Sequence, residues 1–418
     1  MAPRSRPAAV NHPRVIVIAT GDEVLHGEIV NGNAAWLAAA CRDTGYVVTR
    51  HVAVGDDTAA IAAAAKEAAR AAPIVLVTGG LGATVDDLTL AAAAKAFRVP
   101  LRFQPALWAA IRAFFATVGR PCAATNKRQA YLPRGGEALA NAIGTAPGVR
   151  ARFGRAMFFF LPGVPAEMRR IFTDHVRPWL RAQAAGPAPQ LRVLRAFGLP
   201  EATLDERLRR IRFGEVRIGF RATFPEVRIK LSCAGVAPAP AARLLDAAEA
   251  AVRARVGEYI YGVGEEGLPE VVVRGLIAKR WTIAVAESCT GGYLADLCTN
   301  VAGSSQCFEW GIVAYSNAAK TALLAVPTKL IAAHGAVSAE VACAMAEGAR
   351  RSAGTTLGLG VTGIAGPTGG TADKPIGTVY LALAHATGIN VQHYCSPRPR
   401  REFKMLVGYT ALDMVRKL

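Results

Sequence analysis

The sequence has no long hydrophobic run. None of its stretches approaches the roughly 18 uninterrupted apolar residues that a membrane-spanning helix needs. This absence predicts a soluble chain with no membrane partner. The first 13 residues also lack the apolar segment of a secretory signal and a twin arginine. They therefore predict a disordered tail, 1–13, and a cytoplasmic location for the chain.

Paired cysteines are absent as well. The eight cysteines form no C-x-x-C motif and lie mostly within apolar segments. Buried thiols in a reducing compartment fit this pattern better than a disulfide framework or a zinc site. Cys289 is the exception, because it follows Ser288 at a predicted helix start, where a thiolate would be stabilised. The residues alone leave open which of the two is a nucleophile.

Acidic residues are few relative to basic ones. Lysine and arginine number 49 against 31 aspartates and glutamates, which gives a formal net charge of +18. Such an excess favours anionic partners. The arginines are scattered, however, and the densest cluster, Arg398-Pro399-Arg400-Arg401, is short and lacks the interleaved aromatics of RNA-binding stretches. Small phosphorylated substrates, rather than nucleic acid, are the expected partners.

The chain contains enough apolar material for more than one core. Its 418 residues, 52% of them hydrophobic, predict two or three domains. Near the N-terminus, apolar strands at 15–19, 47–54 and 74–77 alternate with helices, which predicts a parallel sheet with helices on both faces. Residues 182–190 indicate a linker. The alternating strands beyond it, such as 227–231, favour an α+β module with helices on one face.

Three strands in the C-terminal part end in polar or glycine-rich loops. Residues 282–286 lead into Glu287-Ser288-Cys289-Thr290-Gly291-Gly292, residues 310–315 into a helix that contains Lys320, and residues 357–362 into a loop that begins at Gly363. Ligands bind outside the carboxyl ends of strands in open α/β sheets, so the three loops are predicted to converge. The side chains of Ser288, Tyr315, Lys320 and Thr362 would then share one pocket.

These side-chain types permit acyl transfer. A serine hydroxyl becomes nucleophilic when a base takes its proton, and a buried lysine with a lowered pKa can be that base. Tyr315 could relay the proton. Free N–H groups where the helix starts after Ser288 could stabilise an oxyanion. The simpler alternative makes Ser288 a helix cap, Tyr315 a core aromatic and Lys320 a solvated lysine.

A second candidate site follows the third N-terminal strand, in TGGLGATVDDLT at 78–89. Glycines there allow the backbone to approach a phosphate closely, and Asp86 and Asp87 could bind a hard cation through oxygen. The alternative interpretation is a tight strand-to-helix turn, with the two aspartates complementing a helix dipole.

Several long motifs carry a family resemblance. AESCTGG at 286–292, AGSSQCF at 302–308, GIVAYSNAAK at 311–320, GAVSAEVACAMAEGAR at 335–350 and VTGIAGPTGG with KPIGTVY at 361–380 resemble, in order and spacing, the C-terminal domain of the CinA family. The resemblance implies deamidation of nicotinamide mononucleotide without a cofactor, with Ser288 as nucleophile and Tyr315 and Lys320 activating it. It implies substrate contacts at Thr290, Gly291, Gly292, Thr362, Gly363 and Gly366.

The N-terminal motifs TGDEVLHGEIVNGN, TGGLGATVDDLT, NAIGTAPGV and LPGVPAEM resemble the molybdopterin-binding-like domain of the same family. In that setting the domain is associated with metal-dependent hydrolysis of ADP-ribose to AMP and ribose 5-phosphate. The resemblance implies Asp87 as catalytic and a divalent cation held by Asp86, Asp87, Asp22 and Glu23. It implies substrate contacts at Thr78, Gly79, Gly80, Gly82, Asn33, Pro162 and Gly163. The family usually has proline where this chain has Ala83, and losing that restraint on φ loosens the loop.

The segment between these regions resembles the KH-like domain of CinA proteins but lacks the G-x-x-G loop that clamps nucleic acid. It is interpreted as a spacer or dimer element, so we expect a homodimer. The expected fold class is a multi-domain α/β chain: a parallel-sheet domain at 14–175, a small α+β domain at 189–262 and an α/β deamidase domain at 267–418.

The expected function is conversion of nicotinamide mononucleotide to nicotinate mononucleotide and ammonia in pyridine-nucleotide salvage, with ADP-ribose pyrophosphatase activity at 14–175. Two alternatives stay open. The chain could be a non-catalytic regulator whose nucleotide-shaped pockets engage a DNA-uptake or recombination partner. Alternatively, residues 14–175 could bind molybdopterin.

Overall fold

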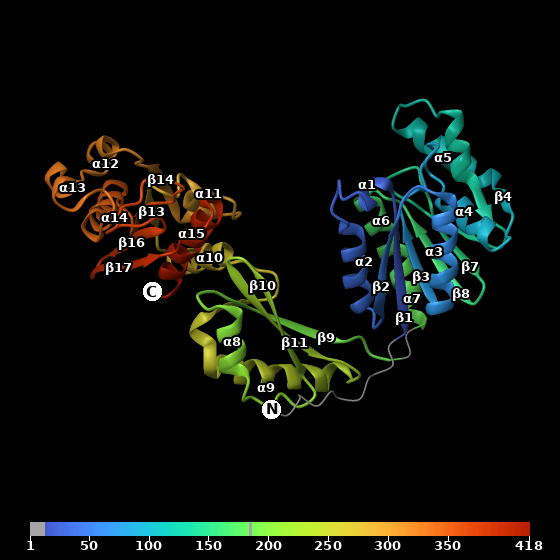
Figure 1. The fold of residues 1–418 in the computed structure, drawn as a ribbon, viewed down its shortest axis with the longest axis horizontal. Coiled ribbons are helices and arrows are strands. Elements are labelled where there is room, and N and C mark those ends of the chain that lie inside the picture. The colour runs from blue at the N-terminus through green and yellow to red at the C-terminus, as the bar shows by residue number, and fades with distance from the viewer. Residues whose placement is uncertain (1–12, 184–185) are drawn as a thin grey trace. The chain divides into compact units, whose positions relative to one another are not determined.

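The structure, a computed structural model, describes residues 13–183 and 186–418 (Figure 1). The expected tail therefore lies outside the described residues, except for residue 13. The chain divides into two compact units. The first comprises Met1–Gln190 with Cys233–Ala242, and the second comprises Leu191–Ser232 with Arg243–Leu418. None of the helices in the described part of the chain combines the length and apolar character that crossing a bilayer requires.

The first unit is built on a six-stranded sheet with the order β2-β1-β3-β8-β7-β6. Its strands are β1 (Arg14–Thr20), β2 (Val47–Val54), β3 (Ile74–Thr78), β6 (Glu137–Leu139), β7 (Gly148–Phe153) and β8 (Ala156–Leu161). The expected parallel arrangement is confirmed for β2, β1, β3 and β8, whereas β7 pairs antiparallel with both of its neighbours, β8 and β6. Only Gly154 and Arg155 separate β7 from β8, and so short a connection can join only antiparallel strands.

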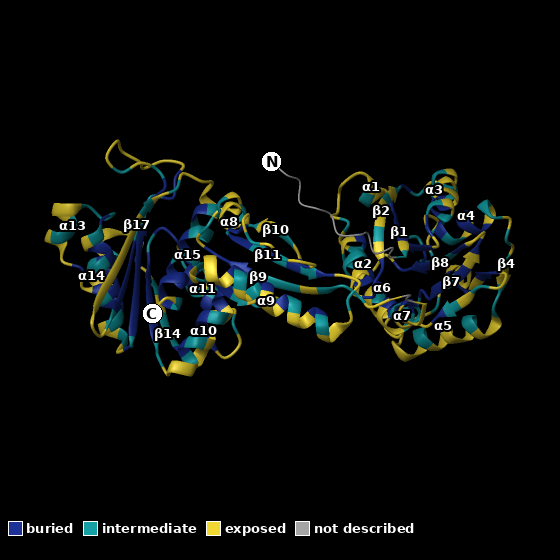
Figure 2. Ribbon diagram, turned by 90° about the horizontal axis from the view of Figure 1, so that it is seen from below, coloured by how far each residue is buried: buried dark blue, intermediate teal, exposed yellow. Residues whose placement is uncertain are grey.

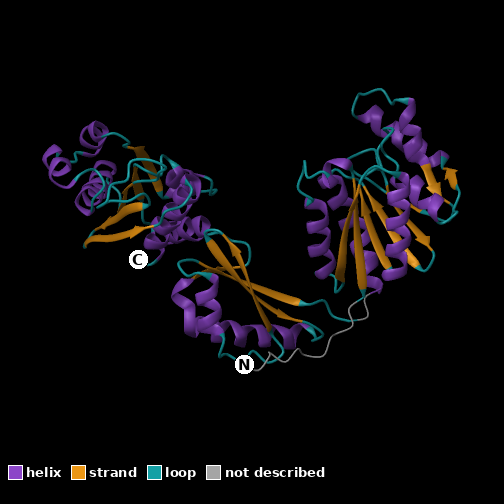
Figure 3. Cartoon of the chain, in the orientation of Figure 1, coloured by secondary structure: helices purple, strands orange, loops and turns teal. Residues whose placement is uncertain are grey.

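Helices cover both faces of this sheet (Figure 3). They are α1 (Asp22–Leu25), α2 (Gly32–Arg42), α3 (Thr58–Ala71), α4 (Thr89–Ala96), α6 (Pro165–Ile171) and α7 (Arg177–Gln183), whereas α5 (Pro105–Thr117) packs mainly against the 3-10 helix Ala124–Ala130. Successive residues of β1 point to opposite faces, so Ile16 and Ile18 pack with the α3 and α4 side while Val15 and Val17 pack with α2 and α6. All five residues of β3 are buried, as expected for a central strand covered on both sides. The neighbouring strand β8 is also almost wholly buried (Figure 2).

The second unit begins with a four-stranded sheet of order β10-β11-β9-β12. Its elements are β9 (Gln190–Ala196), α8 (Glu201–Leu208), β10 (Arg217–Thr223), β11 (Glu226–Cys233), α9 (Pro238–Val256) and β12 (Ile260–Val263). Along β11, Val227, Ile229 and Leu231 are buried while the residues between them are only partly covered. This alternation confirms the half-solvated strand that the sequence predicts.

The C-terminal sheet has the order β14-β13-β15-β16-β17. Its strands are β13 (Ile283–Glu287), β14 (Phe308–Val313), β15 (Leu357–Gly363), β16 (Thr378–His385) and β17 (Gly388–Cys395). The first three are parallel to one another, as predicted, whereas β16 and β17 form an antiparallel extension that the sequence analysis missed. The parallel strands bring the loops after β13, β14 and β15 to one edge.

Two sets of helices sandwich this sheet. On one side lie α10 (Leu268–Lys279), α11 (Tyr293–Thr299) and α15 (Arg400–Arg416), and on the other α12 (Asn317–Leu324), α13 (Thr328–His334) and α14 (Ala339–Ala353). Ile283 and Val285 face the first set and Ala284 and Ala286 face the second. Gly360 lets α14 approach closely, because a Cβ there would collide with the Ala342 carbonyl.

Candidate functional site

Ser288 and Lys320 meet at the edge where β13 and β14 end. Ser288 follows the last residue of β13, and Lys320 lies in α12, the helix after β14. The Lys320 Nζ is 3.2 Å from the Ser288 Oγ. Because the two strands are adjacent and parallel, their following loops are neighbours although the residues are 32 positions apart. The structure thus joins the two residues that the sequence predicts as nucleophile and base.

Lys320 is buried, with only 1% of its surface exposed. Its Nζ also donates to the carbonyl oxygens of Ala314, at 2.9 Å, and Tyr315, at 3.2 Å. No carboxylate of the described residues forms an ion pair with it. Burial accordingly lowers the pKa of Lys320. A lysine amine that is neutral closer to physiological pH can accept a proton. The burial of Lys320 excludes the alternative of a solvated lysine.

The Tyr315 hydroxyl belongs to a different contact. Tyr315 is 60% exposed, and its hydroxyl oxygen accepts a hydrogen bond from Arg400 Nη2 at 2.9 Å. The Nη1 of Arg400 donates to the Gly366 carbonyl at 2.8 Å. Arg400 therefore connects the loop after β14 to the loop after β15, and Tyr315 touches Lys320 through its backbone carbonyl. Neither a core aromatic nor a direct hydroxyl contact with Ser288 is observed for Tyr315.

The sequence places Arg400 in a short basic cluster, for which contact with a phosphate and a solvated turn were both open interpretations. Arg400 is 85 residues from Tyr315. No local motif signals that pairing, because the contact depends on how α15 packs across the domain.

The start of α11 is already occupied by a carboxylate. Glu287, fully buried at the end of β13, accepts hydrogen bonds from the N–H groups of Gly292 at 3.0 Å, Leu294 at 3.0 Å and Ala295 at 2.8 Å. The expectation that these helix N–H groups are free for an oxyanion is therefore wrong. The free donors lie one turn earlier: among the described residues, the N–H groups of Cys289 and Thr290 have no acceptor.

Cys289 is a structural thiol. It is 5% exposed, and burial raises its pKa to about 12. Its sulfur lies beneath Gly363, where an added Cβ would come within 3.1 Å of it. A thiol held protonated and covered is a poor nucleophile. Of the two candidates that the sequence left open, geometry favours Ser288.

The remaining predicted substrate contacts differ in their environment. Thr362 is buried and its hydroxyl donates to the Ala336 carbonyl at 2.7 Å, so that hydroxyl holds the loop before α14. Thr290 is also buried, and its hydroxyl has no partner among the described residues. Gly291 and Gly292 adopt positive φ values of 59° and 91°, which favour glycine and turn the chain from Ser288 into α11.

The second predicted site is a cavity of about 540 Å³ at the carboxyl ends of β1, β3 and β8. Gly79 and Gly80 line it with positive φ, and a Cβ on Gly79 would collide with the Thr20 carbonyl. The cavity also contains most of the other sequence-predicted residues of this region: Glu23, Gly82, Ala83, Asp86, Asp87, Pro162 and Gly163.

Asn33 and Thr78 support that cavity. The Asn33 Nδ2 donates to Thr78 Oγ1 at 3.1 Å and to the Gly163 carbonyl at 2.8 Å. Thr78 Oγ1 donates to the Pro162 carbonyl at 3.0 Å. The start of α2, the end of β3 and the loop after β8 are therefore fastened together. In this structure the Asn33 amide nitrogen and the Thr78 hydroxyl position the loops.

Asp87 holds the glycine-rich loop. Its carboxylate accepts hydrogen bonds from the N–H of Gly82 at 2.6 Å, the N–H of Thr84 at 2.8 Å and the hydroxyl of Thr84 at 2.6 Å. These contacts bracket Ala83, the position at which the family usually has proline. The carboxylate thus supplies a restraint on this loop that the missing proline ring does not.

The four predicted metal ligands do not assemble into a metal site. Asp22 and Asp56 exchange hydrogen bonds between the carboxylate of each and the backbone N–H of the other, at 3.0 and 3.3 Å. Burial raises the pKa of Asp56, and the negative charges of Asp22, Glu23 and Asp86 raise it further. Within the described residues no three His, Cys, Asp or Glu side chains are grouped so that they could hold an ion.

Asp56 lines the cavity but was missed by sequence reasoning. The acidic pair Asp56-Asp57 directly after the second strand was the available signal.

Family models match the whole length of the described architecture. The probable molybdopterin binding domain matches residues 16–182, the damage-inducible protein CinA KH domain matches 191–262, and the CinA C-terminal domain matches 265–418.

Individual proteins give the same result. The CinA-like protein of Geobacter sulfurreducens is 44% identical, over 97% of this chain and 98% of its own. The CinA-like protein of Anaeromyxobacter sp. (strain Fw109-5) is 42% identical, over 96% of this chain and 98% of its own. Among solved structures, the competence/damage inducible protein CihA from Agrobacterium tumefaciens is 39% identical over 36% of this chain and 94% of its own, with a TM-score of 0.34. On the family models and the two full-length CinA-like relatives, the chain belongs to the CinA family.

Proposed function

We propose that the C-terminal domain hydrolyses the carboxamide of nicotinamide mononucleotide to give nicotinate mononucleotide and ammonia. The observation that carries this proposal is the 3.2 Å approach of Lys320 Nζ to Ser288 Oγ, in a setting that lowers the pKa of the amine. A nucleophile within hydrogen-bond reach of a base is the arrangement that acyl transfer requires. The substrate itself is inferred from the family resemblance.

In the first half of the reaction, neutral Lys320 accepts the Ser288 proton as Oγ attacks the carboxamide carbon. The oxygen of the tetrahedral intermediate gains negative charge, and the unpartnered N–H groups of Cys289 and Thr290 are the nearest backbone donors in sequence. Lys320 then returns the proton to the nitrogen, which leaves as ammonia. The product of this half is an ester between Ser288 Oγ and the carboxyl group of nicotinate mononucleotide.

In the second half, a water molecule attacks the ester carbon while Lys320 takes the proton of that water. Collapse of the intermediate expels Ser288 Oγ, which recovers a proton from Lys320. The carboxylate oxygen is supplied by water, so amide plus water yields carboxylate plus ammonium at neutral pH. The same amine acts as base and then acid in each half, which is consistent with a pKa lowered towards the working pH.

Arg400 fits the role of a substrate-binding cation. Its guanidinium is fixed between the Tyr315 hydroxyl and the Gly366 carbonyl, which flank the Ser288 loop. Lys404, one turn further along α15, lies over Gly291, since a Cβ built there would be 3.5 Å from Lys404 Nζ. These cations complement the phosphate of a mononucleotide.

The test is ammonia release from nicotinamide mononucleotide by the full chain. Wild type and Cys289→Ala should both turn over, whereas Ser288→Ala should be inactive. Activity lost in Cys289→Ala but retained in Ser288→Ala would overturn the assignment of the nucleophile. Tight binding of the nucleotide without turnover by wild type would favour the regulatory alternative instead.

The N-terminal cavity supports a second candidate function, hydrolysis of ADP-ribose to AMP and ribose 5-phosphate. Its volume and its exposed glycine backbone suit a phosphate-containing ligand, whereas the carboxylates in its lining do not attract one. Because the carboxylates present do not form a cation site, no metal-dependent step is derived. ADP-ribose should be assayed with and without added Mg²⁺ or Mn²⁺ in the Ser288→Ala variant, which isolates this activity from the amidase. A copurifying pterin would support molybdopterin binding in its place.

A further inference from the structure

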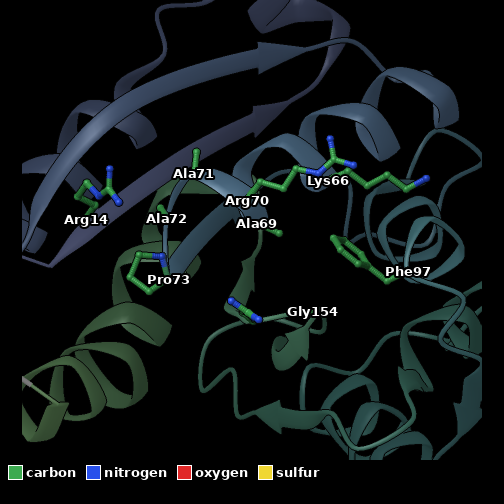
Figure 4. A pocket seen from close by; sticks show the side chains of 10 residues that line it. Arg14, Lys66, Ala69, Arg70, Ala71, Ala72, Pro73, Phe97 and Gly154 are labelled. Atoms are coloured by element: carbon green, nitrogen blue, oxygen red, sulfur yellow. The ribbon is translucent and has the colours of Figure 1, made fainter.

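A second hollow in the first unit has a volume of about 660 Å³. It lies at the amino ends of β1, β3 and β8, whereas the glycine-rich cavity lies at their carboxyl ends. It is lined by Arg14 at the start of β1, by the last turns of α3, by Phe97 after α4 and by the Gly154-Arg155 turn before β8 (Figure 4). Strand β1 runs from Arg14 to Thr20, which lines the other cavity. Seven residues of strand place the two sites roughly 20 Å apart.

Positive charge dominates this hollow. No carboxylate lines it. The four cationic side chains that do are those of Arg14, Lys66, Arg70 and Arg155. All four are exposed, and none forms an ion pair with any described residue. Residues 1–12 and 184–185, which the structure does not describe, contain no Asp or Glu. No described carboxylate therefore lies at ion-pair distance from these four cations.

Helix electrostatics explain only part of the cluster. Cations near the C-terminus of α3 are favoured by the helix dipole, which accounts for Arg70. Lys66 and Arg70, however, are separated by four residues on one face, where like charges repel. Arg14 and Arg155 come from a strand and a turn, and the α3 dipole is no reason for them to lie there. An anionic ligand would explain the position of all four cations.

An aromatic wall completes the hollow. Phe97 is half-buried, and its ring is stacked on Phe153 with centroids 5.0 Å apart and planes 3° apart. Phe158 contacts the same ring edge-on at 5.8 Å. The ring is thus held in place before any ligand arrives. Alanines at 69, 71 and 72 leave space in front of it.

We propose that this hollow binds a nucleoside polyphosphate, with the phosphates among the four cations and the base against Phe97. The volume lies within the range of about 300–1,000 Å³ typical of small-molecule sites. A phosphate-only anion would leave the aromatic wall unused, and a flat apolar ligand would leave the cations unused. The site is separate from both proposed active sites.

Isothermal titration of the full chain with ATP, with inorganic tripolyphosphate and with a single-stranded oligothymidylate tests the proposal. The Lys66→Gln/Arg70→Gln double variant should bind ATP at least tenfold more weakly. The matched control, Lys95→Gln/Arg120→Gln, removes two exposed cations of the same unit outside the hollow and should change the affinity less than twofold. Phe97→Leu should weaken ATP binding but leave tripolyphosphate binding unchanged.

Three results would overturn the proposal. The double variant could bind ATP like wild type, which would place the nucleotide elsewhere. The control pair could weaken binding as much as the test pair, which would indicate attraction by net charge alone. The oligothymidylate could bind more tightly than ATP and lose affinity in the double variant, which would make the surface a nucleic-acid contact. Thermal melting of each variant separates these results from loss of folding.

Discussion

The Lys320 amine lies 3.2 Å from the Ser288 hydroxyl, and its other acceptors are backbone carbonyls rather than a carboxylate. A carboxylate partner would hold the amine in its charged form. Carbonyl oxygens satisfy its hydrogen-bonding capacity without a countercharge, so burial lowers the pKa. In the proposed mechanism this lowered pKa makes the amine available as a base, and it lowers folding stability at pH values where the unfolded amine is protonated.

The pH dependence of turnover follows from this environment. In the proposed mechanism the neutral amine is the base, so kcat/KM for nicotinamide mononucleotide should increase with pH and level off at a pKa below the ordinary lysine value of about 10.4. The pH profile should be measured as ammonia release from acidic pH to a pH above the ordinary lysine pKa. A rate that is independent of pH up to the ordinary lysine value would contradict Lys320 as the base.

Replacing Lys320 by methionine should separate function from stability. Turnover should fall by a factor on the order of 10²–10⁴, the usual contribution of a general base. The folded-state pKa is depressed, so the unfolded chain binds more protons between the folded and unfolded pKa values, and wild-type stability increases with pH across that window. Lys320→Met should remove this dependence and melt no lower than wild type near neutral pH.

Urea unfolding of the two proteins at several pH values measures that difference. The exposed Lys329→Met variant serves as the matched control, since it removes a solvated amine from α13. If wild type and Lys320→Met show parallel pH profiles, the buried amine is not responsible.

Tyr315 and Arg400 should behave as one unit. Tyr315→Phe removes the acceptor of the Arg400 hydrogen bond without disturbing the carbonyl that contacts Lys320. We expect KM to rise in Tyr315→Phe and in Arg400→Met, and the double variant to show less than the sum of the two effects in ΔG. A large fall in kcat with unchanged KM in Tyr315→Phe would instead support proton relay by the hydroxyl.

We expect Glu287 to contribute to the stability of the fold rather than to contact the substrate. Removing its carboxylate leaves three backbone N–H groups at the start of α11 without their acceptor. Glu287→Ala should lower the free energy of unfolding by about 2–5 kcal/mol, since hydrogen bonds to a buried charged group are among the stronger ones. Glu309→Ala, at an exposed position on the neighbouring strand β14, should change it by less than about 0.5 kcal/mol.

Local patterns were good predictors of elements and of the type of chemistry. Apolar runs placed β13 and β15, and the sequence identified Ser288 and Lys320 as partners because strand-end loops of a parallel sheet meet at one edge. The β16 and β17 hairpin was missed because neither strand alternates in burial: β16 is buried along most of its length and β17 is exposed along most of its length. The antiparallel course of β7 was also missed, since no strand had been assigned there.

The sequence by itself determined the family, the three-part domain content and the side chains that can carry out acyl transfer, because these depend on residue type and on periodicities of two and 3.6. Only the tertiary structure decided how each polar group is used. In it, the N–H groups at the start of α11 donate to Glu287, and the Tyr315 hydroxyl accepts a hydrogen bond from Arg400. The Asp87 carboxylate accepts hydrogen bonds from its own loop. Hydrogen bonds depend on distances of a few tenths of an ångström between segments far apart in the chain, and no local pattern encodes those distances.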